Sequence, residues 1–130
     1  MHNYGDYNTA IGHASLNLTL DTLTAKDNTA CGYNTLHSID HGFRCTAVGS
    51  GALSGIGDSQ YCTAIGWRAG YNLGLADSDC IMVGNSGVAG DLNTIRIGNM
   101  PTPNPLDPVG PNEQDKVFIA GIWNCPAIPA

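Results

Sequence analysis

Fixed charge is scarce in this chain, and positive charge is the scarcer kind. Only 12% of the 130 residues are charged, where roughly a quarter is usual, and five Lys or Arg stand against eleven Asp or Glu. The cations are scattered and form no basic stripe: Lys26, Arg44, Arg68, Arg96 and Lys116. Because phosphate backbones are bound by clustered cations, this composition argues against a nucleic-acid partner.

Long apolar runs are missing as well. No stretch approaches the roughly 18 consecutive apolar residues of a membrane-spanning helix, so we expect no membrane insertion. Residues 1–6 lack the charged and apolar regions of a secretory signal. We therefore expect either a product of the cytosol, such as a part of a virion, or a fragment of a longer chain.

The sequence also lacks paired metal ligands and partnered histidines. The five cysteines include no Cys-x-x-Cys pair, and no histidine lies at a zinc-finger spacing. Nor can a partner carboxylate for proton transfer be assigned from the sequence to His13, His37 or His41. We expect no metal, no cofactor and no catalytic residue, and hence no enzyme.

What the chain does have is a repeat. The phrase Asn-Thr-Ala-Ile-Gly begins at Asn8, and its near-copies follow in phase. They occupy 8–12, 28–32, 45–49 and 62–66, with looser copies at 80–84 and 93–98. The glycine that ends the phrase returns about every 17 residues, which suits a coil of short strands and turns. The repeat predicts an all-β fold, a parallel β-roll or β-solenoid with a coil of about 17 residues.

Each coil is expected to hold two short strands. One strand is the phrase itself, and the second follows the glycine, where Leu16, Leu36 and Leu53 recur. We assign residues 1–99 to the repeat array. Residues 100–130 contain a proline-rich loop and then an apolar stretch near 117–122, which we expect to be a strand that caps the array.

The phrase alternates with a period of two, so it has two faces. The face with the bulky branched residues is expected to fill the coil, and the face with the alanines is expected to let another subunit come close. The expected core-facing positions are Thr9, Ile11, Thr29, Cys31, Thr46, Val48, Thr63, Ile65 and Val83. The expected subunit-facing positions are Ala10, Ala30, Ala47 and Ala64.

The phrase, with the small-x-Leu pattern that trails it, resembles the head repeats of trimeric autotransporter adhesins (YadA-like heads). The same phrase occurs in fibre and spike proteins of phages and large DNA viruses. The resemblance covers roughly residues 8–122. It implies a left-handed parallel β-roll that forms a homotrimer, and a structural or adhesive role. Cysteine in place of asparagine and the variable coil length favour a component of a virion surface or extracellular appendage over an autotransporter.

Two groups of residues suggest something more specific. Cys45, Cys62 and Cys80 share one position of the phrase and should stack on successive coils, either as small buried side chains in the asparagine slot or as a crosslink. His13, Tyr33 and Trp67 directly follow the anchor glycines and, with Tyr71, would form an aromatic strip. That strip is either ordinary packing on the outside or a contact site for a host receptor or glycan, which would make the module itself an adhesin head.

Three rival functions are weaker. A hexapeptide-type acyltransferase would repeat its apolar residue every six positions, and this chain does not. A threonine-ladder ice binder would need the in-register threonines outside, whereas we expect them inside. Calcium in the aspartate turns would call for a Gly-Gly-x-Gly-x-Asp repeat, so we interpret those aspartates as turn formers.

Overall fold

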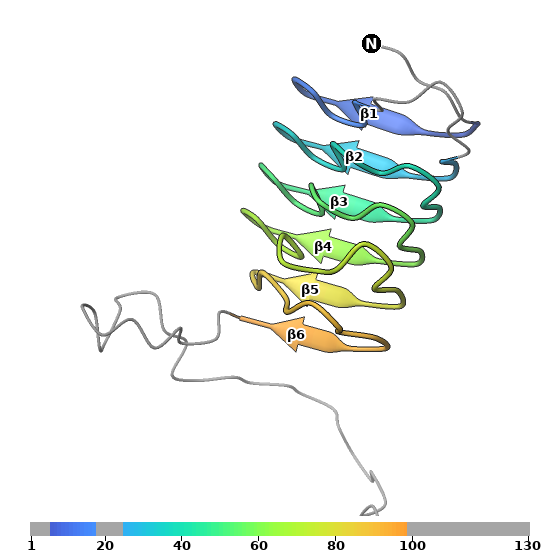
Figure 1. The fold of residues 1–130 in the computed structure, drawn as a ribbon. Coiled ribbons are helices and arrows are strands. Elements are labelled where there is room, and N and C mark those ends of the chain that lie inside the picture. Colours follow the sequence, from blue (N-terminus) through green and yellow to red (C-terminus); the bar gives the residue numbers. More distant parts are fainter. Residues whose placement is uncertain (1–5, 18–24, 99–130) are drawn as a thin grey trace, which may run out of the picture. The chain divides into compact units, whose positions relative to one another are not determined.

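The computed structural model describes residues 6–17 and 25–98, and all of them belong to one compact unit that ends at Asn99. Six three-residue strands form one sheet, in which every neighbouring pair is parallel and the order follows the chain (Figure 1). The strands are β1 (Thr9–Ile11), β2 (Thr29–Cys31), β3 (Thr46–Val48), β4 (Thr63–Ile65), β5 (Ile81–Val83) and β6 (Ile95–Ile97).

The strands pair in the register that the repeat predicts. Thr9 lies opposite Thr29, Thr29 opposite Thr46, and Thr46 opposite Thr63, so each copy of the phrase rests on the next. Successive coils are 20, 17, 17, 18 and 14 residues long. The prediction of an all-β solenoid of parallel strands, with about 17 residues in each coil, is confirmed.

Glycine ends the phrase because the coils come too close there for a side chain. Gly32 has a φ of 144°, a left-handed conformation that side chains disfavour. A Cβ atom on Gly32 would lie 2.8 Å from the carbonyl carbon and oxygen of Gly49 on the next coil. Gly12 and Gly49 meet the following glycine in the same way. The glycines therefore form a column in which backbone packs directly on backbone.

The predicted second strand is wrong. In the described residues each coil contributes one strand, and the segment after the glycine is a series of turns. Leu16, Leu36 and Leu53 have φ angles of 47° to 48°, which no strand residue adopts. Their N–H groups still donate to the next coil, for example from Leu16 to the Thr35 carbonyl at 2.9 Å. This wall of the solenoid is thus a stack of corners joined by hydrogen bonds.

The two faces of the phrase are the reverse of the prediction. Ala30, Ala47 and Ala64 are completely buried inside the coil, and Ala10 is half-buried against the same core, so none of these alanines faces another subunit. The residues expected in the core are instead exposed or half-buried. They are Thr9, Ile11, Thr29, Cys31, Thr46, Val48, Thr63, Ile65 and Val83.

The width of the coil explains this reversal. The opposite wall already fills the interior with large side chains, because Leu36, Leu53, Ile39 and Ile56 are all completely buried. A core packs at a fixed density, so large residues on one wall require small ones on the other. The strands therefore turn alanine inward, and their branched residues point out.

Residues 100–130 lie outside the described part, and so do the predicted proline-rich loop and capping strand. Within the described part, no helix has the length and apolar character needed to cross a membrane.

Candidate interaction surfaces

The outer face of the sheet consists of two straight columns of side chains. The first residue of every strand lies in one column and the third in the other, because the strands pair without any offset. The first column is Thr9, Thr29, Thr46, Thr63, Ile81 and Ile95. The second is Ile11, Cys31, Val48, Ile65, Val83 and Ile97. We call these twelve residues the outer sheet face.

The outer sheet face is strongly apolar for a surface that the chain itself leaves open. Six of its Ile and Val side chains are between 38% and 65% exposed. Isolated apolar residues on a surface are ordinary, but a contiguous apolar patch usually marks an interface. This face carries no charged side chain, since its members are Thr, Ile, Val and Cys. It is therefore a candidate interaction surface of the described residues.

Inside the coil, the residue before each strand links one coil to the next. Asn28 is completely buried; its Nδ2 donates to the Gly42 carbonyl at 3.0 Å, and its Oδ1 accepts from the Cys45 amide at 2.9 Å. Asn8 makes the same pair of contacts with Ala25 and Asn28. An asparagine here satisfies two backbone groups that would otherwise be buried without partners.

The three cysteines in this position also form hydrogen bonds to the next coil, through their thiol groups. Cys45, Cys62 and Cys80 are completely buried, and their thiols donate to the carbonyls of Ser59, Asp77 and Asp91 respectively, at 3.5, 3.4 and 3.1 Å. They lie on successive coils, as predicted, and all are free thiols. The structure thus shows hydrogen-bonded cysteines that replace asparagine, rather than a crosslink.

The environment of these thiols opposes ionisation of all but the first. Interaction between the neighbouring Cys45 and Cys62 thiols lowers the pKa of Cys45 and raises that of Cys62, and burial raises the pKa of Cys62 further. Burial also raises the pKa of Cys80. Since the thiolate is the reactive and metal-binding form, Cys62 and Cys80 are poor candidates for chemistry.

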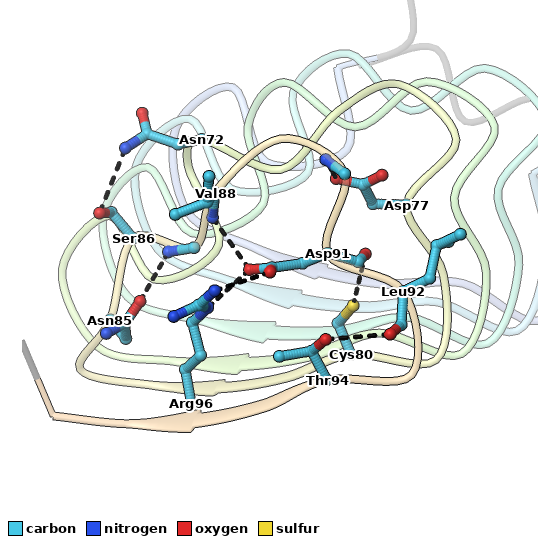
Figure 2. Close-up of polar contacts among 12 residues, drawn as sticks. Asn72, Asp77, Cys80, Asn85, Ser86, Val88, Asp91, Leu92, Thr94 and Arg96 are labelled. Carbon is cyan, nitrogen blue, oxygen red and sulfur yellow. Dashed lines mark hydrogen bonds and ion pairs between the residues drawn. The ribbon is translucent and has the colours of Figure 1, made fainter. Parts of the chain in front are cut away.

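The last described coil is closed by an ion pair (Figure 2). Arg96 lies in β6 at the position that Ala64 and Met82 occupy in β4 and β5, where the side chain turns inward. Its Nε and Nη2 donate to Asp91 Oδ2 and Oδ1 at 2.7 and 2.8 Å. The Arg96 guanidinium and the Val88 amide lower the pKa of the Asp91 carboxyl through these hydrogen bonds. The inward-facing strand position, which holds Ala64 in β4 and Met82 in β5, is therefore occupied by one partner of an ion pair in β6.

A second buried aspartate, Asp77, has a structural role as well. Asp77 is buried, and its Oδ2 accepts from the Gly74 and Gly90 amides at 2.7 and 2.8 Å. It joins two turns on neighbouring coils through these two hydrogen bonds. In the described part of the chain, no group of three or more His, Cys, Asp or Glu side chains is placed to hold a metal ion.

One histidine differs from the sequence-based expectation. His41 does have a carboxylate partner, because its Nδ1 lies 3.0 Å from Asp58 Oδ1. The repeat carried a signal for this contact, since the two residues lie 17 positions apart, which is one coil, and therefore stack on neighbouring coils. Both side chains are more than half exposed and neither lines the groove described next.

The predicted aromatic strip lies along a groove of about 260 Å³ in the turns beyond the strands. Tyr33, Trp67 and Tyr71 line the groove, and His13 stacks on the Tyr33 ring with centroids 5.6 Å apart. The polar lining comprises Asn34, His37, Ser50, Ser54 and Arg68. The structure thus brings all four predicted residues together.

Arg68 is the groove residue that sequence reasoning missed. Its guanidinium carbon lies 4.8 Å from the Trp67 ring centroid and 4.9 Å from that of Tyr71. The available signal was the order Trp67-Arg68 followed by Tyr71, since an arginine between two aromatics in one turn can lie over both rings.

Comparison of the chain with protein-family models, with curated proteins and with solved structures finds no match in any of the three.

Proposed function

We propose that this chain is a structural module that assembles through the outer sheet face into a homotrimer of β-rolls and forms a segment of a fibre, spike or filament on a virion or cell surface. The observation that carries the proposal is the outer sheet face itself, an uncharged and half-exposed apolar surface on six aligned strands. The number of subunits, the left-handed coil and the surface location follow from the resemblance of the phrase to YadA-like heads.

The interior of the roll supports assembly on physical grounds. Much of its core consists of alanine, cysteine and a few leucines and isoleucines, so a single chain buries little large apolar surface. Burial is worth about 25 cal/mol for each Å², and small repeat units gain most of their stability from neighbours. Three outer sheet faces packed together would bury the Ile and Val side chains that the single chain leaves in water.

The decisive measurement is the molar mass of the intact chain in solution, by size-exclusion chromatography with light scattering. We expect three times the 13.5 kDa of one chain. Val48→Lys together with Ile65→Lys places two charges in the centre of the outer sheet face and should shift the protein to the monomer. Leu75→Lys is the matched control, because Leu75 is exposed but lies outside the sheet.

A stable wild-type monomer would contradict the proposal. Circular dichroism of the double variant must retain the β signal, so that loss of assembly is distinguished from loss of the fold.

The outward threonines remove the argument against a second function, ice binding. Thr9, Thr29, Thr46 and Thr63 form a column on the outside of a regular sheet. The run of threonines ends at Thr63, because Ile81 and Ile95 occupy the same strand position in β5 and β6. Apolar side chains run along the whole face, which favours subunit packing. If the protein were a monomer and showed thermal hysteresis, ice binding would become the better supported of the two functions.

A further inference from the structure

We propose that the groove between Tyr33 and Trp67 binds an acidic saccharide, a sugar ring that carries a carboxylate, with Arg68 as the residue that selects the charge. The inference goes beyond the assembly proposed above. It concerns side chains that are not part of the outer sheet face, so either proposal can fail without the other.

The state of Arg68 is the first argument. Arg44 lies 4.0 Å from Asp27 and Arg96 binds Asp91, but Arg68 has no carboxylate within ion-pair distance among the described residues. Its guanidinium lies over the rings of both Trp67 and Tyr71. A guanidinium stacked on aromatic rings keeps the N–H donors at its edge available and matches the two oxygens of a carboxylate. It also provides positive charge in a chain whose net charge is −6.

The spacing of the aromatic residues is the second argument. Tyr33, Ser50 and Trp67 each follow the phrase glycine, so they lie on three successive coils. Coils stack about 4.8 Å apart, which separates the backbones of Tyr33 and Trp67 by roughly 10 Å. His13, which follows the phrase glycine of the preceding coil, stacks on one face of the Tyr33 ring. The small Ser50 thus separates two large aromatic residues, and all three line the groove; we call this part of the groove the slot.

The slot suits a sugar better than a wholly apolar ligand. A pyranose presents C–H groups on its faces, which pack on aromatic rings, and hydroxyl groups at its edge. Ser50, Ser54 and Asn34 supply hydroxyl and amide groups at the edge of the slot. The volume of about 260 Å³ lies just below the range of roughly 300–1,000 Å³ for drug-sized ligands, so the groove has room for one or two rings of a saccharide and leaves any further ring in solvent.

The test is a titration of the full chain with 3′-sialyllactose, with a glucuronic-acid disaccharide and with neutral lactose, by isothermal calorimetry and saturation-transfer NMR. We expect the two acidic sugars to bind about tenfold or more tightly than lactose. Arg68→Gln should lower the affinity for the acidic sugars to that for lactose and leave lactose unchanged. Trp67→Ala should abolish binding of all three.

Arg44→Gln is the matched control, because Arg44 also lies over two rings, those of Phe43 and Tyr61, but outside the groove. It should bind as the wild type does. The proposal is overturned if no sugar binds or if lactose binds as well as the acidic sugars. It is also overturned if Arg68→Gln changes the molar mass of the protein, because the groove is then a subunit contact.

Discussion

Gly32 belongs to a column in which a single methyl group would separate two coils. We expect Gly32→Ala to lower the free energy of unfolding by about 3 kcal/mol or more, because a left-handed conformation is unfavourable for alanine and the new Cβ atom would overlap Gly49. Urea unfolding followed by circular dichroism measures the loss.

Two further glycines separate the causes of that loss. Gly84 has a φ of 60° and no described atom within 4 Å of an added Cβ, so Gly84→Ala reports conformational strain alone and should cost about 1 kcal/mol. Gly55→Ala meets neither obstacle, since its nearest atom would lie 3.8 Å away, and should change stability by less than about 0.5 kcal/mol. Equal effects of all three substitutions would show that the glycine column is not a close-packed contact.

The three buried cysteines show which features of a residue could be predicted from the sequence and which could not. The position of Cys45, Cys62 and Cys80 in the phrase was enough to predict that they stack, because register follows from repetition. Their bonding was not predictable. Asparagine and cysteine have little in common as side chains, and only the buried carbonyl and amide groups of the next coil explain why both fit.

The last described coil depends on ionised Asp91. The folded state lowers the pKa of this carboxyl, so its contribution to stability is complete above the pKa of the unfolded chain, about 3.9, and is lost as the pH falls through the lower folded value. Hydrogen exchange should therefore quicken at the Ile81 and Gly98 amides, which bond across β5 and β6, when the pH is lowered from 6 to 3. The exchange rates must be corrected for the intrinsic effect of pH.

Asp91→Asn should quicken exchange at these two amides roughly tenfold at pH 6 and remove the acid effect. Amides of β2 and β3 should be unaffected. Asp40→Asn is the control, because no hydrogen bond or ion pair of the Asp40 side chain is found among the described residues. If both variants keep the acid effect, another carboxyl governs the last coil.

For whole strands, the sequence predicted where the strands lie and how they pair, but not which face of each strand points into the coil. Alternation separates Ala64 from Thr63 and Ile65, yet it does not say which face is inside. The usual rule that bulky residues point inward fails here because Leu53 and Ile56 occupy the interior from the other wall. The corners escaped prediction for a similar reason, since a leucine at a φ of 48° has no sequence signal comparable to that of glycine.

In the whole molecule, coils are units that can be removed. Deletion of residues 46–62 takes out one coil of 17 residues and joins Cys45 to Thr63, which keeps every column in phase. We expect the product to fold with a cooperative transition and a urea m-value reduced roughly in proportion to the chain removed. Deletion of residues 46–54 removes about half a coil and should abolish the cooperative transition, because glycine would then face side chains. A half-coil variant as stable as the whole-coil variant would contradict this view.

The exact register of coils that differ in length has an evolutionary consequence. Where the four closest copies of the phrase are encoded by similar codons, unequal recombination between them adds or removes the segment that separates them. Such an event changes the protein by whole coils and leaves each remaining junction as it was. Length can therefore vary among descendants of this gene without any intermediate that fails to fold, while the loops between the phrases remain free to diverge.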